Sequence, residues 1–302
     1  MTTSPPSSSG ASGARITPTP DVEVTDRPPR LEVWGDPIEH SRSPQLHAAA
    51  YRVLDLDWSY GCRRVTAVGF ATELASLDDT FRGLSVTYPL KEAAFAASVT
   101  RDARAELTGA VNTLLLTGAG PSGFNTDVGG IVSALADCGI AELRHVRIVG
   151  AGATATSALV AVAELGADQI EVAARRPEAV AALSEIGERL GLSVHGVPLT
   201  RPEPVPVDLT IAALPGGAVV PEADADALAS GGGPLFDVVY GQGMTSLQAA
   251  WLRAGRDIYT GEAMLLHQAV LQVRIFVGGD PAVPLRDESA VVGAMRASLV
   301  GD

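Results

Sequence analysis

The sequence predicts an α/β protein made of two parts, an N-terminal α/β domain followed by a domain with a parallel sheet. A chain of 302 residues is long enough for two domains of ordinary size. Apolar strand-like segments alternate with segments of helical periodicity, which is the pattern of a parallel sheet with right-handed crossovers. Turn residues are dense between Gly118 and Gly123, and the segments before and after this connection differ in character.

The composition argues against several classes of function. Hydrophobic residues make up 46% of the chain, which permits a substantial core, but no apolar run is long enough to span a bilayer. The net charge of -13 argues against a nucleic-acid partner, because binding to phosphates needs a surplus of lysine and arginine. No CxxC pair or close His/Cys cluster indicates a metal site. Cys62 and Cys138 stand in apolar patterns, which predicts buried thiols in a reducing compartment and hence a cytoplasmic protein.

Residues 1–30 are rich in Ser, Thr, Pro and Gly and lack periodicity, so they predict a disordered tail. The tail has no apolar segment of the kind that a secretory signal needs. Asp21, Glu23 and Asp26 also argue against a transit peptide, since such peptides are poor in acidic residues. The folded part is expected to begin at Leu31.

The first elements of the folded part are short. Residues 31–35 are expected to form a strand, and a second strand is expected near residues 58–65. Between them, Ser43 fits the N-cap of a helix and Pro44 fits its first position. After the second strand, a further helix is expected from the spacing of four apolar residues, Phe70, Leu74, Leu77 and Phe81.

Two loops share one design, in which hydroxyl groups stand beside a helix that begins with proline. The first loop is GDPIEHSRSPQLH and the second is GLSVTYPLKEAAF. Helix N-termini carry free N–H groups and the positive end of the helix dipole, which suits a carboxylate or another polar ligand. A strand over residues 110–117 and a returning segment, PSGFNTD, complete this half of the chain.

Asp127 lies where the stretch GFNTDVGG passes from a loop into a helix with an apolar face. One interpretation is structural, an Asp that caps the free N–H groups of the first turn. The other is functional, and Lys91 supports it. Lys91 is expected in the first turn of a helix, where the dipole disfavours a cation. That cost predicts an anionic partner, and Asp127 is the candidate.

The second half opens with a strand at residues 145–149 that runs into GAGATATSALVAVAELG. Gly150 and Gly152 form a tight turn, and Ala155 is the third small residue. A strand, a glycine turn and a helix form the phosphate-binding start of a dinucleotide-binding Rossmann fold. The alternative is a plain strand-to-helix turn without a ligand.

The strand expected at residues 169–174 is followed by Arg175 and Arg176. An NAD-dependent enzyme usually has Asp or Glu at this strand end, where it binds the ribose hydroxyls. Two arginines instead suit the 2′-phosphate of NADP, which they can bind with paired donors. The alternative is a pair of solvated loop charges. Further strands are expected at residues 209–214 and 235–240.

Two C-terminal helices, near residues 261–276 and 288–299, are each apolar on one face. No strand follows them, so we expect them to pack back across the domain boundary. His40 and His47 flank the two serines of the first loop and are alternative acid–base groups. We expect instead that His40 orients the loop and that His47 lies on the helix surface, because Lys91 fits proton transfer better.

Six blocks in order resemble the shikimate dehydrogenase family, over residues from about 31 to 276. The blocks are GDPIEHSRSPQLH, GLSVTYPLK, GAVNT, GFNTD, DVVY and the pattern GxxMLxxQ. The resemblance implies a substrate domain at residues 31–126 plus about 261–302, and a Rossmann NADP-binding domain at residues 127–260, with a cleft between them. It also implies an enzyme that acts on a small molecule as a monomer or a homodimer.

The family's functional residues carry over onto the matching positions of this sequence. Lys91 is implied as the catalytic lysine and Asp127 as its partner, and both are implied to contact the substrate. The other implied substrate-binding residues are Ser41 and Ser43, for the substrate carboxylate, together with Thr87, Asn112, Tyr240 and Gln268. The implied cofactor-binding residues are Gly150, Gly152, Ala153, Thr154, Ala155, Arg175, Arg176 and Gly261.

The departures from the family pattern lie on the cofactor side. The glycine loop is GAGATA where GAGGAA is commoner, AARRP replaces the frequent NRT, and Thr156 stands where an arginine is often found. ALPGG lacks a frequent threonine, and YGQ lacks the usual proline after the tyrosine. These departures bear on cofactor preference, whereas the SxS serine pair is typical of members that use shikimate.

The resemblance implies an NADP-dependent shikimate dehydrogenase activity, the reversible reduction of 3-dehydroshikimate to shikimate on the route to chorismate and the aromatic amino acids. One alternative is a quinate/shikimate or aminoshikimate dehydrogenase of specialised metabolism. Another is an NADP-binding regulator without catalysis. Lys91 and Asp127 argue against the regulator, since a sensor need not keep both.

Overall fold

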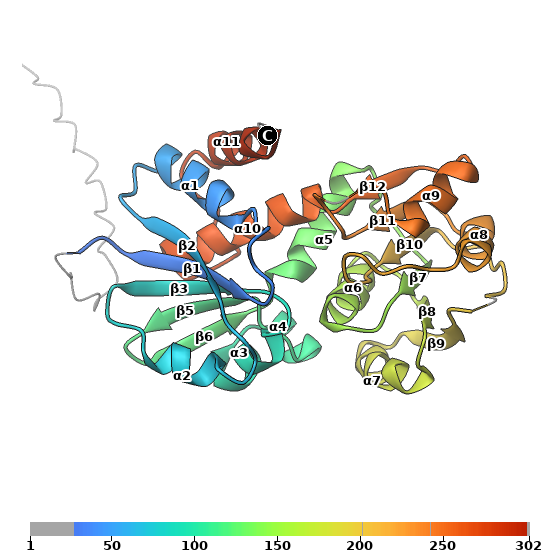
Figure 1. The fold of residues 1–302 in the computed structure, drawn as a ribbon, viewed down its shortest axis with the longest axis horizontal. Helices are drawn as coiled ribbons and strands as arrows, with labels where there is room; N and C mark the ends of the chain where they lie inside the picture. Colours follow the sequence, from blue (N-terminus) through green and yellow to red (C-terminus); the bar gives the residue numbers. More distant parts are fainter. Residues whose placement is uncertain (1–26, 201, 242, 301–302) are drawn as a thin grey trace, which may run out of the picture.

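The computed structural model describes residues 27–200, 202–241 and 243–300, which form two six-stranded sheets. The first sheet comes from the N-terminal part of the chain and the second from the part that follows, and helices lie between them (Figure 1). Residues 1–26 of the predicted tail lie outside the described residues, and Arg30 already begins the first strand.

The first sheet has the strand order β2-β1-β3-β5-β6-β4 and is mixed. Strand β1 is paired in parallel with both of its neighbours, whereas β5 is antiparallel to β3 and β6. Because successive side chains alternate between faces, Leu31 of β1 packs into the core on one face and Trp34 into the core on the other. The strands are β1 (Arg30–Gly35), β2 (Ser59–Arg64), β3 (Phe81–Val86), β4 (Thr100–Arg101), β5 (Thr113–Thr117) and β6 (Gly120–Phe124).

Helices cover both faces of this sheet (Figure 1). On one face lie α2 (Phe70–Ala75), α3 (Lys91–Ala97) and α4 (Ala103–Thr108), and on the other lie α1 (Ser43–Val53), α10 (Glu262–Gly278) and α11 (Glu288–Val300). The two C-terminal helices pack back as expected, since α10 contacts α1, β3 and β5, and α11 contacts α1.

The helix expected from the spacing of Phe70, Leu74, Leu77 and Phe81 is shorter than predicted. Helix α2 ends at Ala75, and Phe81 begins strand β3. Phe70 and Phe81 nevertheless belong to the same core cluster. The apolar spacing therefore marked residues that share a core, although they do not share a helix.

The second sheet is entirely parallel, with the order β12-β11-β10-β7-β8-β9, which is the doubly wound order of a dinucleotide-binding fold. Strands β7 and β8 match the predicted bounds, whereas β10 and β11 end before the predicted residues. The strands are β7 (His145–Val149), β8 (Gln169–Ala174), β9 (Ser193–Pro198), β10 (Leu209–Ala212), β11 (Leu235–Asp237) and β12 (Ile258–Thr260).

The second sheet is also covered on both faces. One core contains residues of α6 (Ala153–Glu164), the short 3-10 helix η1 (Pro177–Val180) and α7 (Ala181–Leu190), and the other contains residues of α8 (Glu222–Gly231) and α9 (Ser246–Arg253). None of the helices in the described ranges is long and apolar enough to cross a membrane.

Helix α5 (Thr126–Asp137) connects the two sheets, and it packs against α10 on one side and α6 on the other (Figure 1). Its first turn carries Asp127. The predicted candidate carboxylate therefore lies at the junction between the two halves of the molecule.

The prediction that both cysteines are buried is wrong. Cys62 is exposed and Cys138 is half-buried, and both thiols are free. Cys62 lies on β2, an edge strand of the first sheet that contains only exposed and half-buried residues.

Candidate functional site

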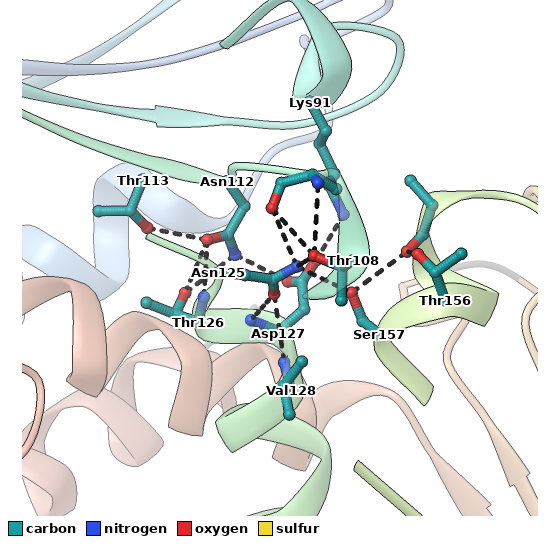
Figure 2. Close-up of polar contacts among 12 residues, drawn as sticks. Lys91, Thr108, Asn112, Thr113, Asn125, Thr126, Asp127, Val128, Thr156 and Ser157 are labelled. Carbon is teal, nitrogen blue, oxygen red and sulfur yellow. Dashed lines mark hydrogen bonds and ion pairs between the residues drawn. The ribbon is translucent and has the colours of Figure 1, made fainter. Parts of the chain in front are cut away.

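Lys91 and Asp127 form an ion pair between the two helix starts that carry them (Figure 2). Lys91 is the first residue of α3, and its Nζ lies 2.5 Å from Asp127 Oδ2. Their side chains are only 12% and 8% exposed. An ion pair with this little exposure is weakly screened by solvent. Asp127 is thus the anionic partner predicted for Lys91 from the unfavourable position of a cation at the start of a helix.

Asp127 does not cap its helix, so the structural interpretation of this residue is wrong. The cap of α5 is Asn125, whose Oδ1 accepts hydrogen bonds from the main-chain N–H groups of Asp127 and Val128, at 3.1 and 3.4 Å. Because a neighbouring side chain satisfies these donors, the Asp127 carboxylate is free to face Lys91.

Asn112 holds the second oxygen of the Asp127 carboxylate. Its Nδ2 donates to Asp127 Oδ1 at 2.8 Å and to Thr126 Oγ1 at 2.9 Å. Its Oδ1 accepts from the main-chain N–H of Thr126 at 2.9 Å and from Thr113 Oγ1 at 3.0 Å (Figure 2). Both hydrogens of the amide are therefore used within the protein.

The Asn125 amide group connects three segments of the chain (Figure 2). Its Nδ2 lies 2.9 Å from Thr108 Oγ1, 3.1 Å from the Ala110 carbonyl oxygen and 3.2 Å from Ser157 Oγ. Ser157 belongs to α6, the helix that follows the glycine turn, and is fully buried. Asn125 is not among the residues predicted from the sequence, although its position two residues before Asp127 at a helix start is a capping signal.

The predicted N-cap of α1 is also wrong. The helix begins at Ser43 itself, and the cap position, Arg42, makes no capping hydrogen bond through its side chain. The Ser43 main-chain N–H instead donates to Ser41 Oγ at 3.3 Å. Ser41 is half-buried and Ser43 is 7% exposed. The hydroxyl two residues upstream thus takes the capping role that the sequence assigned to Ser43.

The second loop departs from its expected design in one respect. Pro89 precedes α3 by two residues, so this helix does not begin with proline as predicted. Thr87, directly after β3, is half-buried, and its main-chain N–H donates to the Trp34 carbonyl oxygen at 2.9 Å. This bond fixes the loop that leads into Lys91.

Tyr240 and Gln268 approach the same region from the C-terminal part of the chain. Burial raises the pKa of the Tyr240 phenol, and the negative charge of Asp127 raises it further. Gln268 is 8% exposed on α10, where its Nε2 donates to the Leu265 carbonyl oxygen at 2.9 Å. The amide therefore folds against its own helix in this structure.

The glycine turn has the geometry of a ligand cradle. Gly150 has φ of 118°, and a Cβ there would lie 2.7 Å from the Ala213 carbonyl oxygen, so the turn requires glycine. Gly152 is the N-cap of α6, with no capping side chain and no acidic residue in the first turn. A Cβ at Gly152 would meet no atom, so space is open at this helix N-terminus.

The remaining predicted cofactor residues surround this turn or follow later strands. Arg175 and Arg176 are exposed after β8, and neither forms an ion pair with any other described residue. Gly261 is buried after β12, and a Cβ there would collide with the Val238 carbonyl oxygen. Ala153, Thr154 and Ala155 form the first turn of α6.

A buried polar cluster beside the site was missed, and the prediction that His47 lies on the helix surface is wrong. His47 is fully buried, its ring stacks on Tyr60 with centroids 3.9 Å apart, and burial lowers its pKa to about 3. Its Nε2 lies 3.2 Å from Gln272 Oε1. The spacing of the sequence could have indicated both residues. His47 lies four positions after Ser43 on α1, and Gln272 lies four positions after Gln268 on α10. His40 is exposed, so it is not part of this cluster.

No group of three or more His, Cys, Asp or Glu residues suitable for a metal ion occurs in the part of the chain that the structure describes.

A family model and curated relatives agree on one family. The model of the shikimate dehydrogenase substrate binding domain matches residues 33–114. A shikimate dehydrogenase (NADP(+)) from Anaeromyxobacter sp. (strain Fw109-5) is 34% identical over 276 residues, which cover 84% of this chain and 93% of the relative.

Solved structures agree in fold over most of the chain. A shikimate dehydrogenase from Mycobacterium tuberculosis has a TM-score of 0.75 and 36% identity, and the match covers 89% of this chain and 99% of the other. A shikimate 5-dehydrogenase from Thermus thermophilus, solved in complex with NADP(H) and shikimate, has a TM-score of 0.72 and 30% identity with the same two coverages.

Proposed function

This chain belongs to the shikimate dehydrogenase family, and on that premise we propose that it catalyses the reversible, NADPH-dependent reduction of 3-dehydroshikimate to shikimate. It is an oxidoreductase that acts on a CH–OH group of a small molecule and takes part in chorismate and aromatic amino acid biosynthesis. Its cofactor is NADP.

The observation that carries this proposal is the ion pair between Lys91 and Asp127. Lys91 is the only lysine in the chain. An ammonium group fixed at a nearly buried position can donate a proton to, or stabilise, the oxygen of a ketone that is being reduced. Asp127 holds the ammonium in place and can accept a hydrogen bond from a substrate hydroxyl.

The roles of the other substrate residues are part of the proposal. Ser41 and Ser43 lie at the start of α1, where hydroxyls and helix N–H groups suit the carboxylate of shikimate. Thr87, Tyr240 and Gln268 are assigned to the hydroxyls and the ring. Asn112 is assigned to the site as a ligand, and its bond to Asp127 supports a further role in holding that carboxylate.

The residues of the glycine turn fit NADP. The uncapped N-terminus of α6, open at Gly152 and free of acidic residues, suits a pyrophosphate. Arg175 and Arg176 are exposed cations that suit the 2′-phosphate. Ala153, Thr154, Ala155 and Gly261 complete the assigned cofactor surface. When bound, the cofactor supplies or accepts the hydride, and the chain positions both ligands and supplies the proton.

The two sheets support a division into a substrate domain of residues 31–126 plus about 261–302 and a cofactor domain of residues 127–260. That the protein is a monomer or a homodimer is part of the proposal. The free cysteines support a cytoplasmic location.

The test is turnover of the purified protein, followed as NADPH absorbance, with shikimate and quinate each offered against NADP+ and NAD+. The proposal expects the highest kcat/KM with shikimate and NADP+. Higher kcat/KM with quinate would favour the quinate-using alternative. Binding of NADP+ without turnover of either substrate, or of aminoshikimate, would favour a non-catalytic regulator.

A further inference from the structure

Gln272 lies at the centre of a chain of buried hydrogen bonds that leads to Asp127. It is 2% exposed on α10, one turn beyond Gln268. Its Oε1 lies 2.8 Å from Ser85 Oγ, and its Nε2 lies 3.1 Å from Thr113 Oγ1. Thr113 Oγ1 is in turn 3.0 Å from Asn112 Oδ1, and Asn112 holds Asp127.

Two main-chain groups fix the direction of this chain. The Asn112 carbonyl oxygen, 3.4 Å from Gln272 Nε2, can only accept, so the NH2 group of Gln272 faces Asn112 and Thr113. The Thr126 main-chain N–H, 2.9 Å from Asn112 Oδ1, can only donate. The side-chain carbonyl of Asn112 therefore faces Thr126, and its NH2 group faces the carboxylate.

Thr113 connects the two amides, and its hydroxyl has one possible arrangement between them. It accepts from Gln272 Nε2 and donates its single hydrogen to Asn112 Oδ1. The Thr113 side chain is fully buried, so water cannot replace either partner. The hydroxyl thereby opposes a rotation of the Asn112 amide that would turn its oxygen toward the Asp127 carboxylate.

At the far end of this series of hydrogen bonds, the donors also point toward Gln272 and Asp127. Burial keeps His47 neutral by lowering its pKa, so only one of its ring nitrogens carries a hydrogen. Its Nε2 faces Gln272 Oε1, which can only accept, and its Nδ1 lies 3.1 Å from the Tyr51 hydroxyl. The hydrogen is therefore on Nε2, and Tyr51 donates to Nδ1. On a second branch, Tyr60 OH donates to Ser85 Oγ at 2.6 Å, and Ser85 donates to Gln272.

We propose that Gln272 is a positioning residue, which acts through Thr113 and Asn112 to hold the Asp127 carboxylate against Lys91. Every donor in the chain points toward the one negative charge at its end, so each bond polarises the next and strengthens the last. The inference rests on the proposed function, because it assigns the network to the ion pair of that reaction.

The test removes single hydrogen bonds of this network and leaves Lys91 and Asp127 unchanged. Thr113→Val deletes the connecting hydroxyl with little change of shape, and Gln272→Met deletes the amide that orders it. Each should lower kcat by about tenfold, the effect of one net hydrogen bond of ordinary strength, with a smaller change in the KM of shikimate. Thr113→Ser keeps the hydroxyl and should restore most of the lost activity.

An Asp127→Asn background separates positioning from a merely structural role. If the network acts on the carboxylate, Thr113→Val should change kcat less than about twofold in that background. Its effect on the melting temperature should be the same in both backgrounds. An equal loss of kcat in both would assign Thr113 to general packing and overturn the inference.

A second measurement does not depend on turnover. Reductive methylation modifies Lys91 and the chain terminus alone, and peptide mass spectrometry follows the rate at Lys91. We expect Thr113→Val and Gln272→Met to speed this reaction and Thr113→Ser to leave it slow, because a loosened partner exposes the amine to the reagent. Unchanged rates in all variants would overturn the inference. An inactive wild-type protein would overturn the proposed function alone.

Discussion

The side-chain amide of Asn125 lies 3.2 Å from Ser157 Oγ, and this contact joins the helix that carries Asp127 to the helix that follows the glycine turn. Ser157 Oγ in turn lies 3.2 Å from the carbonyl oxygen of Ala153, the first residue of that second helix. The capping residue of α5 and the first residue of the helix after the glycine turn are therefore connected by two consecutive hydrogen bonds. A second connection between the halves is the paired contact of Arg104 with Glu164, at 2.9 and 2.6 Å.

The first prediction tests this connection with Ser157→Ala. The change removes an acceptor from a buried amide and should destabilise the protein by roughly 1 kcal/mol. It should also lower kcat/KM for NADP+ by a few-fold, because the cap of α5 and the cofactor turn lose their link. Thr156→Ala is the matched control, since Thr156 Oγ1 also bonds to the Ala153 carbonyl oxygen, at 2.7 Å, without touching Asn125. Equal kinetic losses in both variants would contradict the link.

The second prediction concerns cofactor choice. Arg175→Asp should weaken NADP+ relative to NAD+ by roughly 1.5–3 kcal/mol, the value of a charged hydrogen bond, because a cation facing the 2′-phosphate becomes an anion. The KM values of both cofactors measure this. Arg189→Asp makes the same charge change on the exposed face of α7 and should leave the KM values of both cofactors unchanged. A parallel rise in both KM values for Arg175→Asp would mean that Arg175 does not bind the 2′-phosphate.

The third prediction separates the two serines. Ser41→Ala removes the oxygen that accepts from the Ser43 N–H and should cost on the order of 1 kcal/mol of stability. Ser43→Ala removes no cap and should have a smaller effect on the melting temperature. Both should raise the KM of shikimate if both hydroxyls bind its carboxylate. Thermal melting beside the kinetics checks each role, and a greater stability loss for Ser43→Ala would reverse the assignment.

The fourth prediction follows from the buried ring of His47, whose pKa is lowered from 6.5 to about 3 by burial. Above pH 6.5 neither the folded nor the unfolded chain is protonated here, and the ring has no pH-dependent effect. Below pH 6.5 this histidine is protonated in the unfolded chain but stays neutral in the folded protein. Stability should therefore fall as the pH drops from 6.5 toward 3, by at most about 1.4 kcal/mol per unit.

Urea unfolding at several pH values between about 4 and 7 measures this slope. His47→Gln keeps a donor toward Gln272 and cannot titrate, so its slope should be shallower by up to one proton. His195→Gln is the control, because His195 is exposed on β9. A slope that does not change in His47→Gln would mean that other groups account for the whole effect.

The sequence predicted the parts of this molecule that depend on local chemistry. The glycine turn between β7 and α6 and the bounds of β8 followed from residue types and periodicity. The pairing of Lys91 with Asp127 followed from the electrostatic cost of a cation at a helix start. The need for an anionic partner is a local effect of the helix start, although the partner itself, Asp127, lies 36 positions away.

What the sequence could not predict depends on contacts between distant segments. His47 is buried because α10 covers it, and its partner Gln272 is 225 positions away. The Asp127 carboxylate is free because Asn125 takes the cap, and either residue type can cap a helix. Ser41 replaced Ser43 for the same reason. Where two nearby side chains compete for one donor, only the folded backbone decides between them.

The last prediction is that Lys91 and Asp127 act as one unit. Lys91→Ala should lower kcat by roughly a hundred- to ten-thousand-fold, the usual value of general acid–base help, while the KM of shikimate changes little. Asp127→Asn keeps the shape and the bond from Asn112 but removes the charge, so it should also lower kcat. Because each residue acts through the other, the double variant should lose much less than the product of the two single losses.

The double-mutant cycle distinguishes this from two independent roles. Stopped-flow or steady-state rates for the four proteins give the coupling directly, and losses that multiply fully would mean that the residues act separately. Amine labelling adds a structural check, because Lys91 is the only lysine in the chain and its ion pair with Asp127 is 2.5 Å long. Asp127→Asn should therefore speed the methylation of Lys91. A Lys91→Ala protein with near-normal kcat would refute the assignment, since no other lysine could take over the proton transfer.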